Sequence, residues 1–379
     1  MKRHNLVIII VVVLCVIAGV AIGNHFYHKS SYSKSSEFSI ANSPYADPTT
    51  SVTKLFFADK NGNQVLLQRT ENGWLVDNEY PANQKLVDEM LYTIDHMRIT
   101  APVSVKKNNN IITQLSTSNT KVEIYQILPR INLFNAVKLF YHETRSKVFY
   151  IGGTTQDNQN TFILKEGDDN VYMAHLPGFR GSISSRFSAN PIDWRDHLIY
   201  DVQIGDIDSV KLEITDDPDN GFIIKEIDRY QYTMNRLNGE PVDFSDNKVL
   251  SLLSSFSDVR FESFLTDIDS ARRDSIINSP FQQRLTLTTK DGKSRSVTTF
   301  RLRTNSDIYD YSEDDIDNFH EMLTDPDHKY ALLSEGNEFV LIQDFAFGKL
   351  LKPADFYSKD YKDEIPQVYY KELETVESR

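Results

Sequence analysis

An uncharged apolar run near the N-terminus constrains this chain more than any other feature. Residues 6–23 read LVIIIVVVLCVIAGVAIG and contain no charged side chain. As a helix with a rise of ~1.5 Å per residue, they would extend roughly 27 Å, close to the ~30 Å hydrocarbon core of a bilayer. A helix that is apolar on all sides is typical of a membrane span. We therefore predict a transmembrane anchor at 6–23.

The flanks of the anchor predict its orientation. Lys2 and Arg3 precede it, which favours a cytoplasmic tail at 1–5 and a single-pass inner-membrane protein whose bulk is periplasmic or otherwise extracytoplasmic. Residues 24–50 are rich in Ser, Tyr and Asn, and we expect them to form a tether. Two alternatives to this signal-anchor compete: a signal peptide cleaved within 19–23, and a lipoprotein signal at Cys15.

The charge of the chain is uneven and acidic. The formal net charge is -13, and residues 201–379 carry 21 Lys and Arg against 37 Asp and Glu. This acidic half would repel phosphate, which argues against nucleic-acid binding. Solubility explains the charge simply, and a docking face for a basic partner is the alternative. Cys15 is the only cysteine of the chain, so an intramolecular disulfide is impossible.

Two stretches of the sequence repeat one order of elements. The first has predicted strands and a helix at 52–57, 64–67, 73–76 and 84–96. The second has them at 210–214, 222–224, 230–233 and 246–257. Asn-Gly between the first two strands of each stretch is a hairpin signal. Each helix has one predicted apolar face: Val87, Met90, Leu91 and Ile94 in the first, and Val249, Leu250, Leu253 and Phe256 in the second.

Later segments of the two stretches also match. The hairpin at 162–173 resembles that at 331–342, with Glu-Gly at the same spacing in both. Further strand pairs are predicted between these segments: 136–141 with 147–151, and 284–289 with 296–302. Residues 312–323 carry an additional helix signal in the second copy.

The sequence therefore predicts an α+β protein made of two diverged copies of one unit. Copy 1 spans 51–200, copy 2 spans 207–357, and a C-terminal tail covers 358–379. Each copy is expected to be a mostly antiparallel sheet with one packed helix, because hairpin signals dominate both.

Several of these motifs together resemble a bacterial membrane-anchored family that carries a domain of unknown function. The segments that carry the resemblance are Gly73-Trp74-Leu75-Val76, Met90-Leu91, Ile151-Gly152-Gly153, Phe162–Leu176 and Trp194-Arg195-Asp196. Copy 2 lacks both the Trp and the Gly-Gly. The family is found beside, or fused to, auxiliary subunits of gliding-motility-type ABC exporters. The resemblance implies an envelope location and a transporter neighbour, and no catalytic residue.

Three polar clusters could in principle bind metal or perform catalysis. Asp317, His320 and Glu321 would share a helix face, but an acidic first helical turn explains them more simply. The segment Asp325-Pro326-Asp327-His328 has an Asp-His pair, but Asp-Pro is typical of a turn. In 216–221, Pro218 occupies a calcium-ligand position, so a hairpin turn is favoured over an EF-hand loop.

Three further segments have both a functional and a structural interpretation. Gly152-Gly153 lacks the lysine of a phosphate-binding loop and predicts a strand end where the backbone must either turn or be closely approached. The basic stretch 178–197 could bind an acidic partner or form an ordinary surface loop. The aromatic residues could line a sugar site but are more typical of core: Tyr200, Phe222, Tyr230, Tyr232, Phe339, Phe345 and Phe347.

We assign no catalytic, cofactor-binding or metal-ligating residue from the sequence. The function it favours is a non-enzymatic, membrane-anchored envelope protein that binds or scaffolds partner proteins beside an ABC-type exporter. A carbohydrate-binding or carbohydrate-degrading envelope protein is the alternative. It would need exposed aromatic residues in a cleft, or two carboxylates at glycosidase spacing.

Overall fold

From a computed structural model of the chain we describe residues 37–38, 40, 48–133, 137–303, 324–335 and 337–362. The predicted membrane anchor at 6–23 lies outside these residues. Among the residues that are described, no helix is long and apolar enough to cross a membrane. The helix predicted at 312–323 also lies outside them. The chain divides into two compact units, with the boundary between Asp196 and His197.

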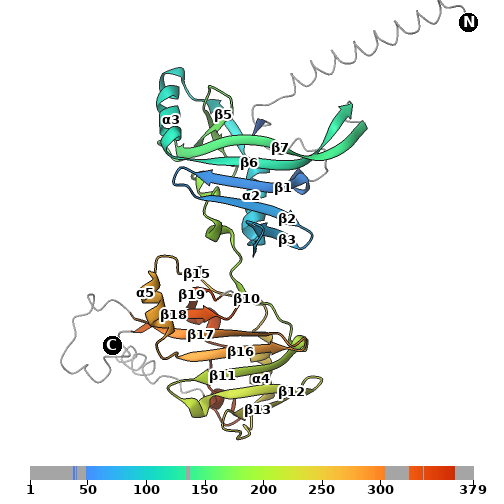
Figure 1. The fold of residues 1–379 in the computed structure, drawn as a ribbon, viewed down its shortest axis with the longest axis vertical. Helices are drawn as coiled ribbons and strands as arrows, with labels where there is room; N and C mark the ends of the chain where they lie inside the picture. Colours follow the sequence, from blue (N-terminus) through green and yellow to red (C-terminus); the bar gives the residue numbers. More distant parts are fainter. Residues whose placement is uncertain are drawn as a thin grey trace, which may run out of the picture. The chain divides into compact units, whose positions relative to one another are not determined.

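Unit 1 is built on a nine-stranded antiparallel sheet, with strand order β4-β3-β2-β1-β6-β7-β8-β9-β5 (Figure 1). Its helices are η2 (Pro48–Ser51), α2 (Gln84–His96) and α3 (Val105–Thr117). Its strands are β1 (Val52–Asp59), β2 (Gln64–Thr70), β3 (Gly73–Val76), β4 (Tyr80–Pro81), β5 (Arg98–Pro102), β6 (Asn119–Leu133), β7 (Val137–Thr154), β8 (Thr161–Lys165) and β9 (Tyr172–His175). Short 3₁₀ turns at Ser184–Arg186 and Pro191–Trp194 complete the unit.

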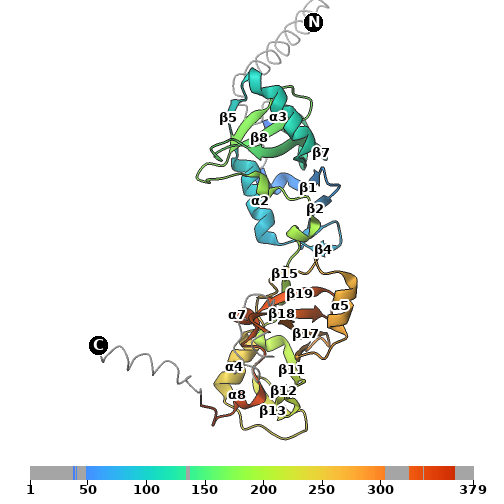
Figure 2. The same ribbon diagram turned by 90° about the vertical axis from the view of Figure 1, so that its left-hand side faces the viewer.

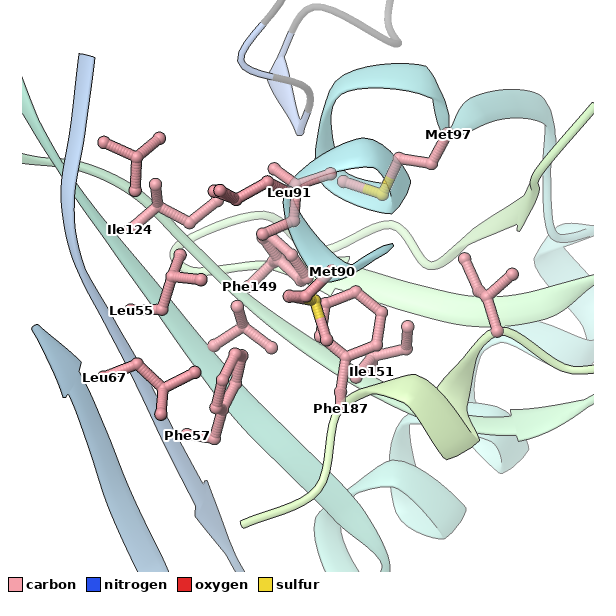
Figure 3. Packing of buried hydrophobic residues seen from close by; sticks show 14 of the residues in the cluster. Leu55, Phe57, Leu67, Met90, Leu91, Met97, Ile124, Phe149, Ile151 and Phe187 are labelled. Atoms are coloured by element: carbon pink, nitrogen blue, oxygen red, sulfur yellow. The ribbon is translucent and has the colours of Figure 1, made fainter. Parts of the chain in front are cut away.

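Helix α2 covers one face of this sheet and makes the main core of unit 1. It begins where the Asn83 side chain accepts a hydrogen bond from the Leu86 backbone N–H, which satisfies a free donor of the first turn. Met90 and Leu91 point from the helix into the sheet residues, including Phe57 and Phe149 (Figure 3). The predicted bounds and the predicted buried face of this helix are both confirmed.

Unit 2 is built on an eight-stranded antiparallel sheet, with strand order β13-β12-β11-β16-β17-β18-β19-β15. The strands are β11 (Ile207–Ile214), β12 (Phe222–Asp228), β13 (Gln231–Arg236), β15 (Ser263–Phe264), β16 (Gln283–Thr289), β17 (Ser294–Arg303), β18 (Thr324–Leu333) and β19 (Phe339–Gln343). A separate two-stranded sheet joins β10 (Leu198–Tyr200) to β14 (Val259–Arg260). The helices are α4 (Asp246–Ser254), α5 (Ser270–Ile277), α7 (Asp344–Phe347) and α8 (Ala354–Tyr357), with 3₁₀ turns at Ile204–Asp206 and Pro218–Asn220.

The two sheets share one topology. When β4 at the edge of unit 1 is set aside, each strand of unit 1 has its counterpart at the same place in the order of unit 2. The first strands agree in detail, because β1 and β11 have the same length and the same pattern of buried positions. Each also carries a register shift at its start, between Val52 and Lys54 in β1 and between Ile207 and Ser209 in β11.

A second helix packs on the opposite face of each sheet, which differs from the prediction of one helix per copy. Alternate strand residues point to opposite faces, so Ile163 enters the main core of unit 1 whereas Phe162 packs with α3 residues such as Leu115. In unit 2, α5 packs in the same way on Phe300 and its neighbours. Figure 2 shows α4 and α5 on opposite sides of the unit 2 sheet.

Three details of the sequence prediction are wrong. Residues 136–141 and 147–151 are not two paired strands, because 137–141 and 147–151 both belong to β7, which pairs with β6. The buried face of α4 contains Leu252, and the predicted Leu250 is 38% exposed. The spacing explains this correction: Val249, Leu252, Leu253 and Phe256 repeat the i, i+3, i+4, i+7 pattern of α2.

The third correction concerns the predicted tether at 24–50. Phe38 and Ile40 lie within it, yet both are buried in the core of unit 1. The ring of Phe38 meets those of Phe149 and Tyr172 edge-on, at centroid distances of 6.0 Å and 5.9 Å. Burial of the Phe38 and Ile40 side chains therefore anchors part of this segment to the sheet.

Candidate functional site

The extension of the β6–β7 hairpin carries a group of exposed apolar residues of unit 1. Strand β1 pairs with β6 only as far as Gln126, and β7 begins to pair with β8 at Phe149. Residues 127–133 and 137–143, which we call the arm, pair with each other beyond these points. In the described part of the chain no third strand pairs with the arm. Figure 1 shows it as a twisted ribbon that continues past the end of β1.

The composition of the arm is unusual for a ribbon open to solvent. Its exposed large apolar residues are Ile131 at 40%, Val137 at 45%, Leu139 at 46%, Phe140 at 70% and Tyr141 at 48%. An isolated two-stranded hairpin is at best marginally stable in water. A contiguous apolar surface rimmed by polar residues typically marks a site of protein or membrane interaction.

The charge of the arm is basic. Arg130 and Lys138 are the charged side chains of its outer part, residues 127–142, if His142 is neutral. The one carboxylate of the arm, Glu143, pairs with Lys54 at the base. This local charge contrasts with the net charge of -13 of the whole chain. A complementary surface would therefore be apolar at its centre and acidic at its rim.

Polar side chains hold the base of the arm in place. The side chain of Gln126, which is 3% exposed, donates to Ser51 Oγ at 2.7 Å and accepts from Ser146 Oγ at 2.5 Å. Nearby, Glu143 accepts from Thr53 Oγ1 at 2.6 Å and from Lys54 Nζ at 2.7 Å. The arm therefore leaves the sheet in a defined direction.

Glu123 adds a charged cluster on the same strand pair. It accepts hydrogen bonds from Lys121 Nζ at 2.6 Å and from Tyr125 Oη at 2.7 Å, and Arg145 lies 3.3 Å away. Burial alone would raise the pKa of Glu123, but the hydrogen bonds from Lys121 and Tyr125 outweigh it, and the pKa lies below its ordinary value of 4.5. The carboxylate is therefore a stabilising ion rather than a proton donor at neutral pH.

The corresponding hairpin of unit 2 has no arm. Val52 pairs with Gln126 just as Ile207 pairs with Thr289, so Gln126 and Thr289 occupy equivalent places. After Thr289 the chain turns at once, and the Thr289 N–H donates to the Lys293 carbonyl oxygen at 2.9 Å. The arm is thus an extension present in one of two otherwise matching hairpins.

The predicted metal cluster cannot be located in this structure. Asp317, His320 and Glu321 lie outside the described residues. Within the described ranges, no group of three His, Cys, Asp or Glu side chains could hold a metal ion. Asp216 to Gly221 forms the predicted hairpin turn, in which Asp216 pairs with Arg301 and Asn220 accepts from Arg236.

The Asp325–His328 segment is not the simple turn that was predicted, because it begins strand β18. Asp325 Oδ1 accepts from the backbone N–H groups of Asp327 and His328, at 2.8 Å and 3.0 Å. The side-chain pair does form, with His328 Nδ1 3.2 Å from Asp325, and Glu262 approaches the other ring nitrogen at 3.4 Å. The carboxylates of Asp325 and Glu262, which flank the half-buried His328 imidazole, stabilise a bulged strand. The sequence did not predict the position of Glu262.

The prediction of close backbone approach at Gly152 is confirmed. A Cβ atom there would lie 2.5 Å from Leu115 Cδ2 and 2.9 Å from the Ser118 carbonyl oxygen. The glycine therefore lets the C-terminal end of α3 contact β7. Strand β7 ends at Thr154 and leads to the β7–β8 turn, so the helix of a phosphate-binding loop does not follow it.

The basic stretch is partly tied to the body of unit 1. Arg186 donates to Thr93 Oγ1 at 3.3 Å, and the guanidinium of Arg195 stacks on the Tyr80 ring at 3.7 Å. Arg180, by contrast, faces a polar cleft between the β7–β8 turn and the loop that follows β9. The stretch is therefore an ordered loop of which one arginine is available for a ligand.

The aromatic residues are mostly core, as predicted. Tyr200, Phe222, Phe339 and Phe347 are buried in unit 2, as are Trp74 and Trp194 in unit 1. Two aromatic residues depart from the prediction, since Tyr230 is 54% exposed and Phe345 is 95% exposed. Both lie where a strand has ended, so neither faces a sheet core.

The architecture defines an α+β protein of two antiparallel sheet units, of which one carries an apolar, basic arm. Residues 74–275 match a protein family described as "Domain of unknown function (DUF4340)". Because this match spans more than half of the chain, the protein belongs to that family. The matched region begins in β3 of unit 1 and ends in α5 of unit 2, so it includes the junction between the units. No curated protein and no solved structure matches the chain.

Proposed function

We propose that this protein is a non-enzymatic, membrane-anchored scaffold of the cell envelope that binds a partner protein through the arm of unit 1. Residues 6–23 would span the inner membrane with residues 1–5 in the cytoplasm, and both sheet units would lie outside the cytoplasm. The observation that carries the proposal is the exposed apolar surface that the arm presents through Ile131, Val137, Leu139, Phe140 and Tyr141.

The shared topology supports an origin by duplication. We infer that the two units are diverged copies, because they agree in strand order and in the register shift of the first strand. In this view, unit 2 retains the short hairpin and unit 1 has acquired the arm. One copy has gained an extension that is exposed to solvent. A contact with another molecule explains such an extension more simply than a contribution to the stability of the fold does.

The proposed anchor would bring the partner of the arm close to the membrane. Phe38 is fixed in the core, so only the residues between Gly23 and Phe38 separate the proposed anchor from unit 1. At about 3.5 Å per residue, this linker spans at most roughly 50 Å. The chain then enters β1 at Val52, whose partner Gln126 stands at the base of the arm. A membrane-resident partner would therefore be within reach.

The chemistry of the arm indicates what the partner presents. Leu139, Phe140 and their neighbours need an apolar groove, while Arg130 and Lys138 favour carboxylates at its rim. A subunit of an ABC-type exporter, the neighbour implied by the family resemblance, is the membrane-resident partner that we propose.

Site-specific photocrosslinking in intact membranes tests this proposal. A photoreactive residue at position 140 of the full-length chain should give one dominant protein adduct. Tyr230 is the matched control, because it is also an exposed aromatic residue with a positive φ, 59° against 58° for Phe140. Equal adducts at both positions, or none at position 140, would count against the arm as the binding surface.

The carbohydrate alternative requires exposed aromatic residues, and the two tryptophans of the chain do not supply them. Trp74 and Trp194 are 3% and 4% exposed, so neither could stack on a sugar. The polar cleft beside Arg180 is a separate feature that does not depend on either tryptophan.

A further inference from the structure

A polar cleft of about 800 Å³ lies at one end of the unit 1 sheet. It is formed by the turn between β7 and β8, the middle of β5, the end of β9 and the loop that follows β9. The side chains that matter for its chemistry are Thr100, Asp157, Asn160, His175, Phe179 and Arg180. A cleft of this size is within the range of about 300–1,000 Å³ that small-molecule sites occupy.

The turn that forms one wall is ordered by its own hydrogen bonds. The N–H of Thr155 donates to the Asn160 carbonyl oxygen at 2.9 Å, and the Asn160 N–H donates to Thr155 Oγ1 at 3.1 Å. Asp157 Oδ1 accepts from the Gln159 N–H at 3.1 Å and also from Thr155 Oγ1. These bonds hold the pKa of Asp157 below its ordinary value, with the one from Thr155 the largest cause. The wall is therefore preorganised and carries an ionised acceptor.

A hydrogen-bond chain fixes the polar atoms on the opposite side. Thr100 Oγ1 donates to Asn160 Oδ1 at 2.8 Å and lies 2.9 Å from His175 Nδ1. Because the hydroxyl has one hydrogen, His175 must donate from Nδ1 to Thr100, which leaves Nε2 of the neutral ring as an acceptor. With its oxygen used, the Asn160 amide offers its N–H groups. Among the described residues, neither His175 Nε2 nor Asn160 Nδ2 makes a hydrogen bond.

Arg180 and Phe179 complete the lining. Arg180 is exposed and forms no ion pair or hydrogen bond with any residue in the described ranges. The Phe179 ring is 37% exposed, and the Arg186 guanidinium stacks on it with its carbon 4.8 Å from the ring centroid. The cleft therefore combines donors, acceptors and an aromatic surface within one loop cluster.

We propose that this cleft is a saccharide-binding site. A sugar hydroxyl both donates and accepts, which matches acceptors at Asp157 and His175 set beside donors at Asn160 and Arg180. The apolar C–H face of a pyranose ring would pack on the open part of the Phe179 ring. A simple anion would use Arg180 but would meet the Asp157 carboxylate. The site would bind rather than hydrolyse, since Asp157 is the only carboxylate lining the cleft among the described residues.

Titration of the full-length chain, held in a detergent that contains no sugar, tests the proposal. Cellobiose, maltose and N,N′-diacetylchitobiose serve as probes, and binding is read by calorimetry and by the ring ¹⁵N shifts of His175. At least one disaccharide should bind and shift His175, whereas sorbitol, an open-chain polyol, should not. Arg180→Gln and Asn160→Ala should each weaken binding about tenfold, the usual consequence of losing one good hydrogen bond.

Controls separate binding from folding and from simple anion capture. Arg180 forms no hydrogen bond or ion pair with a described residue that its loss could disrupt, so an unchanged thermal unfolding midpoint is expected for Arg180→Gln. Arg229→Ala, which removes an exposed arginine of unit 2, should leave binding intact. The proposal is overturned if no disaccharide binds, if inorganic phosphate shifts His175 as much as the sugars do, or if Arg180→Gln binds like the parent. None of these results bears on the arm, which the cleft does not include.

Discussion

Val52 pairs with Gln126 at the point where β1 stops accompanying β6. On one side of this pair, β6 is an interior strand of a nine-stranded sheet. On the other side, it continues with β7 as its only partner among the described strands. The pair therefore marks the boundary between the main sheet of unit 1 and the arm that extends beyond it.

Gln126 should be important for the stability of unit 1. Gln126→Leu removes two side-chain hydrogen bonds, to Ser51 Oγ and from Ser146 Oγ, at a buried position. Losing both should lower the free energy of unfolding by about 2 kcal/mol. Urea denaturation measures this, and Gln64→Leu, at an exposed position of β2, should have little effect. Equal effects of the two variants would show that the buried hydrogen bonds matter little.

Glu123 should make the stability of unit 1 depend on acid pH. Since its pKa is lowered in the folded state, its stabilising contribution is complete above the ordinary value of 4.5 and is lost as pH falls below that value through the folded pKa. Glu123→Gln should therefore be clearly less stable than the parent at pH 7, and the difference should narrow at pH 3. Denaturation at both pH values tests this, with exposed Glu71→Gln as the control. A difference that does not change with pH would contradict the assignment.

The corrected face of α4 gives a matched pair of leucine variants. Leu252 is 2% exposed and Leu250 is 38% exposed, although the two lie only two positions apart. Leu252→Ala should cost about 3 kcal/mol because it leaves a cavity in the core, whereas Leu250→Ala should cost less than about 0.5 kcal/mol. Thermal or urea unfolding of unit 2 measures both. A larger effect at Leu250 would restore the face predicted from the sequence.

Adjacent glycines in β7 should differ in their tolerance of a methyl group. Gly152→Ala would place a Cβ atom 2.9 Å from a backbone carbonyl oxygen, which cannot move without moving α3. At Gly153 the nearest atom, at 3.0 Å, is the amide nitrogen of the flexible Gln114 side chain. We expect Gly152→Ala to destabilise unit 1 by roughly 2 kcal/mol and Gly153→Ala to cost much less. Similar losses in a denaturation experiment would argue against close packing of α3 on β7.

The sequence predicted elements whose patterns are set by one buried face. The bounds of α2 and its apolar positions followed from a stripe at helical spacing, and the Asn-Gly turn after β1 fixed the first hairpin. Helices α3 and α5 were not predicted because few of their residues are buried apolar side chains at helical spacing. Leu115 is the only buried residue of α3, and α5 has none.

The arm could not be recognised from an alternation of apolar and polar residues. That pattern arises when one face of a strand is buried and the other is exposed to solvent. Both faces of the arm lie outside the sheet core, so the polar run from His142 to Ser146 resembled a turn between two strands. It is instead the middle of β7. The cleft was equally hidden, since Thr100, Asn160 and His175 come from three separate segments that only the sheet brings together.

The most direct test of the account replaces the arm with the turn of its counterpart. Residues 127–143 are exchanged for Lys-Asp-Gly, the sequence at 290–292 in the matching hairpin of unit 2. No described residue of the exchanged segment belongs to the buried cores, so unit 1 should stay folded, with its stability lowered only by the loss of the exposed bonds from Thr53 and Lys54 to Glu143. The partner is first identified as the protein that crosslinks to position 140 of the parent chain. Quantitative purification from solubilised membranes should then recover this protein together with the parent chain, but not together with the exchanged chain. Equal recovery with both chains would contradict the assignment of the arm as the binding surface.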